Sequence, residues 1–389
     1  MLGAPLVEHA RQTVPECCDR WVLVAGDWSH LHYNGHESKT DRIELSRKRD
    51  LGYELFTALA VSDQDGSPLA PLCLELRAQA GVYTTRSPTV LKPLSRLDGL
   101  EPAMDYVQGQ RLGKPVVFIM DREADSVMHL RRWDATGKQF LVRANDNPQV
   151  VHEGENKPLA QVARDIRSRL KRTRPVLYQG KPAQQFVAET IVVLTRPACL
   201  HRVDQKTRRK KHKRIHGAAL ALRLVVVEVR DAHGKRRACW LLLSNLPASV
   251  RASQIALWYY WRWRIESYHK LLKSAGQQVE QWLQGSAEAL VRRLIVTAMT
   301  AVLVWQIARD PSPQAAQLRQ TLVKLSGRQM KRTKNSRGFT EPALLAGLTI
   351  LVPMMIALEV MSPEELKAAA HELMPLIRSM ASPGPSGSG

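Results

Sequence analysis

The fold that we expect follows first from KPVVFIMD at residues 114–121. An unbroken apolar run of this length is typical of a strand that is buried on both faces of a sheet. A similar run, WVLVAGD, stands at 21–27. Between the two, YELFTALAVSD (53–63) and APLCLELRAQA (70–80) flank the turn sequence QDGSP, which predicts a hairpin. The first part of the chain is therefore expected to form a mixed sheet.

Helical patterns alternate with these strands. Residues 101–112 have helical spacing, a second helix is expected over about 124–134, and QFLVRAN at 139–145 reads as a further strand. Such alternation of strands and helices predicts an α/β fold in which helices cover a mixed sheet.

The composition along the chain divides it into five parts. They are a short N-terminal segment (1–20), the first part of a core (21–145), a β-strand-rich insertion (146–250), the closing helices of the core (251–310) and a helical C-terminal region with a flexible tail (311–389).

The charge of the chain points to a polyanionic partner. Lys and Arg number 57 and Asp and Glu 36, so the formal charge is 57 − 36 = +21. Such a surplus favours a nucleic acid as partner. Inside the insertion, HRVDQKTRRKKHKRIH (201–216) holds eight Lys or Arg. We expect this stretch to be a mobile basic loop between two strands, either simply solvated or in contact with phosphates.

Other features indicate a cytoplasmic protein with no membrane partner. The five cysteines are an odd number without a C-x-x-C pair, which fits a reducing cytosol. The N-terminus lacks a basic region followed by an apolar one, so no secretory signal is expected. The apolar stretches 294–307 and 343–360 are expected to be buried helices, because each falls short of about 18 uninterrupted apolar residues.

Two acids stand directly after apolar strands. Asp27 follows VLVAG and Asp121 follows VVFIM. A carboxylate there loses hydration and is costly unless a positive group, such as a metal ion, compensates it. The alternative is that each acid only forms a turn or caps a helix. Glu123 and Asp125 compete with Asp121 for the same role.

A third acid, Glu266, belongs to the sequence WYYWRWRIESYHKLLKSAG (258–276), which we expect to be part of one long helix over 251–276. At about 100° per residue, Tyr259, Arg262, Glu266 and Lys273 fall within about 60° of one another on the helix surface. This stripe is suited to holding a cation beside a phosphate. An ordinary helix face with Arg–Glu ion pairs is the alternative.

Three carboxylates in a strongly basic protein suggest a metal-dependent reaction on nucleic acid. Oxygen ligands suit Mg²⁺ or Mn²⁺ better than Zn²⁺. Two such ions can activate a water or a 3′-hydroxyl on one side of a phosphodiester and stabilise the leaving oxygen on the other. The basic surface supplies affinity for DNA through the release of counterions.

The chain also resembles a known family. The run DREAD at 121–125, together with the Y-x-x-R-x-x-x-E-x-x-x-x-x-x-K spacing of Tyr259, Arg262, Glu266 and Lys273, is similar to the bacterial DDE transposases of the insertion-sequence-four family. That family carries a Tyr-Arg-Glu-Lys signature and includes the Tn-five type enzymes. The resemblance extends over about residues 20–310 and implies an RNase H-like fold.

The resemblance also implies roles for individual residues. The implied ligands of the Mg²⁺ or Mn²⁺ ions, and thus the catalytic residues, are Asp27, Asp121 and Glu266. Trp240, in CWLLLSN, would stack on a base flipped out of the duplex during hairpin formation. The alternative for Trp240 is a core side chain. The implied contacts to DNA phosphates are Tyr259, Arg262, Lys273 and Arg122.

The function that we expect is that of a cut-and-paste DNA transposase, acting on double-stranded transposon ends and target DNA as a homodimer in the bacterial nucleoid. Members of the family usually carry an N-terminal helical domain, whereas 26 residues precede Asp27. Either the chain is a fragment, or the insertion and the C-terminal helices take over recognition of the transposon end. Two alternatives are a catalytically inactive or domesticated DNA-binding relative and a structural RNA-binding protein.

Overall fold

The computed structural model describes residues 2–203, 210–274, 276–328 and 338–381. The centre of the basic stretch expected as a loop (204–209), most of the basic segment at 327–338 and the tail SPGPSGSG (382–389) lie outside the described residues.

Ten α-helices and sixteen strands make up the described part of the chain. The helices are α1 (Ala4–Cys17), α2 (Arg96–Gly109), α3 (Val127–Ala135), α4 (Leu159–Asp165), α5 (Ala252–Trp261), α6 (Trp263–Lys273), α7 (Ala287–Arg309), α8 (Pro313–Leu325), α9 (Glu341–Val360) and α10 (Pro363–Ala381). The strands up to the insertion are β1 (Val22–His32), β2 (Ile43–Glu44), β3 (Leu51–Ser62), β4 (Pro68–Ala78), β5 (Gly81–Thr84), β6 (Ser87–Leu91), β7 (Val116–Met120) and β8 (Gln139–Arg143). Those of the insertion are β9 (Gln149–His152), β10 (Glu155–Pro158), β11 (Lys171–Tyr178), β12 (Lys181–Leu194), β13 (Ala198–Val203), β14 (Lys210–Ile215), β15 (Leu220–Arg230) and β16 (Arg236–Ser244).

Five strands form the core of the large sheet, in the order β4-β3-β1-β7-β8. Strand β3 pairs antiparallel with both β1 and β4, whereas β1 and β7, and β7 and β8, pair in parallel. Three antiparallel strands followed by two that run parallel to the first give an RNase H-like topology. The expected α/β fold with a mixed sheet is confirmed.

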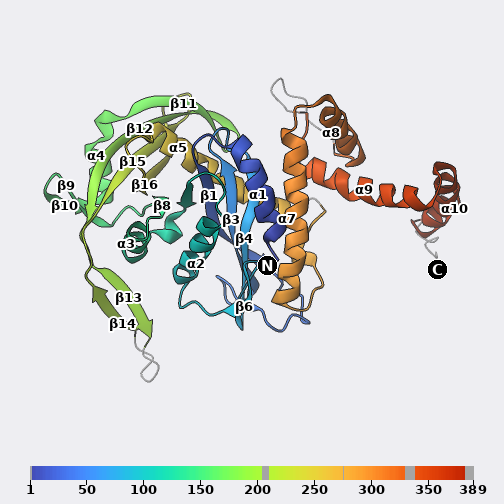
Figure 1. Cartoon of the computed structure of the whole chain (residues 1–389), viewed down its shortest axis with the longest axis horizontal. Coiled ribbons are helices and arrows are strands. Elements are labelled where there is room, and N and C mark those ends of the chain that lie inside the picture. The colour runs from blue at the N-terminus through green and yellow to red at the C-terminus, as the bar shows by residue number, and fades with distance from the viewer. Residues whose placement is uncertain (1, 204–209, 275, 329–337, 382–389) are drawn as a thin grey trace, which may run out of the picture. The chain divides into compact units, whose positions relative to one another are not determined.

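Apart from β13 and β14, which form a separate two-stranded sheet, the strands of the insertion join the sheet of the core. Strand β16 pairs antiparallel with β8, and the ladder continues through β15, β12 and β9 to β10. The predicted β-rich character of the insertion is confirmed, and six of its eight strands extend the sheet of the core. Figure 1 shows the hairpin β13–β14 leaving this sheet.

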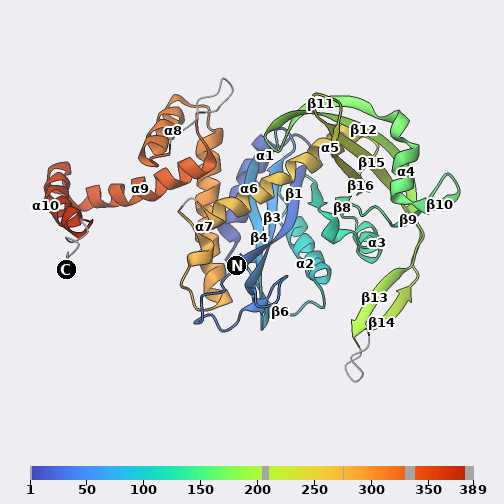
Figure 2. The same cartoon turned by 180° about the vertical axis from the view of Figure 1, so that it is seen from behind.

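Helices cover both faces of the core sheet. On strand β1, Val24 and Gly26 line the same small cavity as Leu100 and Met104 of α2. Side chains alternate along a strand, so the residue after Gly26 points to the opposite face. That face is covered by α6, which Figure 2 shows crossing the strands together with α5.

Three local expectations were wrong. Strand β1 does not end at Asp27 but continues to His32, because it stays paired with β3 over its whole length. The helix expected over 251–276 is two helices that meet at Arg262. The basic stretch at 201–216 is not all loop, since its ends belong to β13 and β14.

The described chain divides into two compact units. The first comprises 1–272 and 279–302 and contains the whole sheet; the second comprises 273–278 and 303–389. In the second unit α8 and α9 pack closely at Gly347, where a Cβ would lie 2.2 Å from the Leu322 carbonyl oxygen.

The two apolar stretches differ in burial. The stretch 294–307 lies in helix α7 and is mostly buried, as expected, although Val296, Met299 and Leu303 are exposed. Helix α9 contains 343–360, but large apolar side chains of its second half are exposed, so the expectation of a buried helix was wrong there. By length and composition alone α9 could cross a membrane, a test that the core helices of many soluble proteins also pass.

Candidate active site

The guanidinium group of Arg262 brings the three predicted acids together. Its Nη1 lies 3.0 Å from Asp27 Oδ2, and its Nη2 lies 2.9 Å from Glu266 Oε1 and 3.4 Å from Asp121 Oδ2. The Arg262 side chain is 3% exposed, while the three carboxylates are 20–30% exposed. Residues 27, 121 and 266, far apart in the sequence, thus converge at one partly open cluster, which we call the acid cluster.

The sheet topology explains why two of the acids meet. Strands β1 and β7 are parallel and in register up to the pair Gly26 and Met120. Asp27 and Asp121 directly follow this last pair on the two segments, so both stand where the β1–β7 ladder ends. Functional groups commonly gather at the carboxyl ends of parallel strands.

The third acid is placed by the junction of α5 and α6. The Arg262 N–H donates to the Tyr259 carbonyl, and the Ile265 N–H donates to the Arg262 carbonyl, so the turn there is tighter than an α-helix. The His269 ring nitrogen Nε2 lies 3.1 Å from the Thr57 hydroxyl on β3, which anchors α6 to the sheet. Arg262 and Glu266 therefore face β1 and β7.

Asp121 has the largest number of partners in the cluster. Its Oδ1 accepts hydrogen bonds from the Arg122 N–H at 2.7 Å, from the Tyr259 hydroxyl at 3.2 Å and from Arg143 Nη1 at 3.5 Å. Burial by itself would raise the pKa of Asp121, but the positive charge of Arg262 and these donors outweigh it and hold the pKa below its usual value.

Asp27 has the opposite balance. Burial raises its pKa to about 6, although Arg262 and the Trp28 N–H, 2.9 Å from Oδ1, act against this rise. The nearby Glu266 and Asp121 add to it. Negative charge at Asp27 is thus only partly compensated by the protein itself.

The other sequence-predicted residues lie in different surroundings. Tyr259 is 1% exposed, and burial raises its pKa to about 12. Trp240 on β16 is 4% exposed, with its ring centroid 5.3 Å from that of Tyr259. The side chain of Arg122 is exposed, so only its backbone N–H contributes to the cluster. Lys273 is the last residue of α6.

The competing acids next to Asp121 have partners elsewhere. Glu123 lies 3.0 Å from Arg96 Nη1, and Asp125 Oδ2 accepts hydrogen bonds from the backbone and the side chain of Asn145. Of the acids in DREAD, Asp121 is therefore the one that reaches Arg262.

Arg143 is a site residue that the sequence analysis missed. Part of the signal was present, because QFLVRAN was expected to be a strand and Arg143 lies within it. Strands β7 and β8 are parallel, with Met120 paired to Val142, so Arg143 is level with Asp121. Only the register of this pair identifies the contact.

The cluster has the donor chemistry for a hard cation. Three carboxylates from distant segments already surround one positive group, and the raised pKa of Asp27 indicates unsatisfied negative charge. Among the described residues, no three His, Cys, Asp or Glu side chains are spaced to hold a metal ion directly. The guanidinium group of Arg262 occupies the space between Asp27, Asp121 and Glu266, and these are the carboxylates that would hold such an ion.

Comparison with known proteins finds a distant structural likeness to a transposase. No family model matches the chain, and a search of curated proteins finds no match. Among solved structures, the chain is similar to piggyBac transposase in a cryo-EM structure of its synaptic complex with hairpin DNA, with 11% sequence identity and a TM-score of 0.38. The match covers 100% of this chain and 64% of that transposase chain.

Proposed function

We propose that this protein is a DDE transposase of the insertion-sequence-four type, which cuts and joins DNA with divalent metal ions. The observation that carries the proposal is the convergence of Asp27, Asp121 and Glu266 at the end of the β1–β7 ladder of an RNase H-like sheet. The formal charge of +21 supports double-stranded DNA as the substrate.

In this proposal the side chains of the cluster have different roles. The three carboxylates would hold a pair of Mg²⁺ or Mn²⁺ ions, which when bound would supply Lewis-acid activation of a water or 3′-hydroxyl. Arg262, once drawn away from the acids, binds a DNA phosphate, as do Lys273 and Arg122. Tyr259 and Arg143 keep Asp121 in place through their hydrogen bonds to Oδ1.

The full reaction would be cut-and-paste transposition. A freed 3′-hydroxyl attacks the opposite strand to form a hairpin, the hairpin is reopened, and the ends are joined to target DNA by a homodimer in the cytoplasm. Trp240 would take the flipped base during hairpin formation. Because Trp240 is 4% exposed and lies against Tyr259, this role requires its ring to become uncovered.

A second candidate function is DNA binding without cleavage. The observation that favours it is the position of Arg262, whose guanidinium group occupies the place where a metal ion would have to bind. A relative that had lost its activity could keep this ion-paired arrangement permanently.

One experiment separates the two functions. Purified protein is incubated with labelled duplexes carrying the DNA that flanks the coding sequence, with Mg²⁺ or with EDTA. A transposase gives Mg²⁺-dependent nicks and hairpins, whereas a binding protein shifts the duplex without cutting it.

Two conservative variants test whether Asp121 and Glu266 are required for DNA cleavage. Asp121→Asn and Glu266→Gln keep the size of each side chain and should retain duplex binding but lose cleavage by at least about a hundredfold. Glu123→Gln is the matched control, because Glu123 lies in the same DREAD run but pairs with Arg96. A variant of the cluster that still cuts at the normal rate would remove its residue from the site.

A further inference from the structure

Two hollows on the first unit adjoin each other, and we call the two together the outer groove. One, of about 330 Å³, lies between the β11–β12 turn and the β15–β16 turn. The other, of about 520 Å³, lies between the β11–β12 turn and the helices α5 and α6. Both are lined by Tyr178 and Gln179, so the surface is continuous from one to the other.

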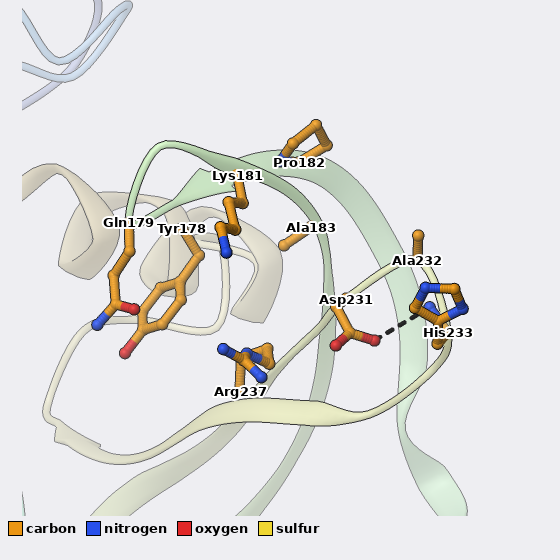
Figure 3. A pocket seen from close by; sticks show the side chains of 9 residues that line it. All are labelled: Tyr178, Gln179, Lys181, Pro182, Ala183, Asp231, Ala232, His233 and Arg237. Atoms are coloured by element: carbon orange, nitrogen blue, oxygen red, sulfur yellow. Dashed lines mark hydrogen bonds between the residues drawn. The ribbon is translucent and has the colours of Figure 1, made fainter.

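The outer groove is basic. Four Lys or Arg side chains line it, and Asp231 is the one acid among the lining residues. Oδ1 of Asp231 already accepts hydrogen bonds from two backbone N–H groups of its own turn, at His233 and Lys235. Figure 3 shows Lys181 and Arg237 directed toward the same hollow as the ring of Tyr178.

Aromatic rings in the groove are held in place by the protein. The Tyr260 hydroxyl donates to the Leu177 carbonyl at 2.7 Å, which fixes the β11–β12 turn to α5. Trp261 packs so tightly on Gly66 that a Cβ there would lie 2.4 Å from the indole ring. Rings that are already fixed lose little conformational freedom when a ligand stacks on them.

The groove and the acid cluster are built on the same two helices. Tyr259 faces Asp121, whereas its neighbour Tyr260 faces the groove. Arg262 reaches the acids, whereas Arg264 lines the groove. The groove and the acid cluster therefore lie on different sides of the α5–α6 junction.

We propose that the outer groove binds an unpaired stretch of DNA, with phosphates on Lys181 and Arg237 and a base stacked on Tyr178. A groove lined by both cationic and aromatic groups is suited to a single strand, since its bases offer their faces for stacking while its backbone follows the positive charges. This inference deepens the proposed function and rests on it for DNA as the ligand.

The test measures binding of a short labelled oligothymidylate by fluorescence anisotropy in EDTA, so that no cleavage takes place. The double variant Lys181→Glu/Arg237→Glu should weaken binding at least about tenfold and reduce the slope of log affinity against log salt by about 1.4. The control Arg47→Glu/Lys48→Glu changes the net charge equally at exposed positions outside the groove and should have a much smaller effect.

Stacking is tested separately at Tyr178. Tyr178→Ala should weaken binding of the single strand by about fivefold or more, whereas Tyr178→Phe, which keeps the ring, should bind like the wild type. Any of three results would overturn the proposal. The groove and control charge-reversal variants could lose the same affinity for the single strand, or Tyr178→Ala could bind it like the wild type. The groove variants could also lose as much affinity for fully paired duplex as for the single strand.

Failure of the groove and failure of the proposed function give different results. A wild type that cuts DNA with Mg²⁺ while the groove variants bind single strands normally refutes the groove alone. A wild type that never cuts but binds single strands through Lys181 and Arg237 refutes the transposase function alone.

Discussion

Arg262 is the residue on which the chemistry of the cluster depends. Its guanidinium group is buried among three acids, with its Nε atom left without a hydrogen-bond partner. A DNA phosphate offers this group a competing anion, and a divalent cation offers the acids a competing charge. Binding of DNA and binding of metal should therefore favour each other, because both separate Arg262 from the acids.

Arg262→Gln should open the cluster to metal without DNA. Removal of the buried positive charge should lower the free energy of unfolding by about 3 kcal/mol. Added Mn²⁺ should then raise the melting temperature more in the variant than in the wild type, measured by scanning calorimetry. Arg264→Gln is the control, since Arg264 bonds to the Gly66 carbonyl. The same Mn²⁺ effect in wild type and Arg262→Gln would contradict this account.

Asp27 should make stability depend on pH in metal-free buffer. Its pKa rises from 3.8 to about 6 on folding, so between these values the folded protein holds a proton that the unfolded chain has released. The contribution of Asp27 to the free energy of unfolding therefore falls as pH rises through this window and is constant above it. Urea unfolding in EDTA should show a flatter profile for Asp27→Asn, and an identical profile would disprove the shift.

At the scale of elements, the junction of α5 and α6 positions two surfaces at once. One side carries Arg262 and Glu266 into the acid cluster, and the other carries Tyr260 and Trp261 into the outer groove. The junction is held from outside by the β3–β4 turn, where Gly66 lies against Trp261 and accepts a hydrogen bond from Arg264.

Two glycines with the same backbone conformation test this contact. Gly66 has φ +72° with Trp261 against it, whereas Gly234 has φ +76° with no atom within 4 Å of an added Cβ. Gly234→Ala should cost about 1–2 kcal/mol from backbone strain alone. Gly66→Ala should cost more, about 3 kcal/mol or above, because the indole must also move. Equal losses in chemical denaturation would show that the Trp261 contact contributes nothing.

At the scale of the whole molecule, most strands of the insertion continue the sheet of the core, and this sheet is joined to the helices of the site. Arg223 on β15 makes the connection. Its Nη1 donates to the carbonyls of Pro247 and Val250, at 2.9 and 2.7 Å, and its Nη2 lies 2.6 Å from Glu189 Oε2. The segment between β16 and α5 is thus tied to the insertion strands.

Arg223→Met should therefore weaken the whole first unit. The buried Val250 carbonyl would lose its donor, whereas the Pro247 carbonyl keeps the Val250 N–H, so we expect a cost of about 1–3 kcal/mol in unfolding free energy. Arg167→Met is the control, because Arg167 is half exposed and its partner Glu228 keeps two other arginines, so less than about 1 kcal/mol is expected. Comparable losses in the two variants would contradict the role of Arg223.

Much of this arrangement could be predicted from the sequence alone. Apolar runs and turn residues located the core strands, because period and composition act within a few neighbouring residues. The three acids were found through their neighbours, Asp27 and Asp121 after apolar runs and Glu266 through helical spacing. The same local patterns predicted an α/β sheet with a β-rich insertion, which is what the strand order contains.

Contacts between distant segments required the folded chain. Arg143 joins Asp121 only through the parallel register of β7 and β8, and Arg262 stands among the acids because α5 and α6 meet at a tight turn. The extension of β1 past Asp27 depends on its partner β3. Pairing and packing between remote residues cannot be predicted from the sequence next to each residue. The charge environment of each acid is therefore determined by the fold and not by its motif.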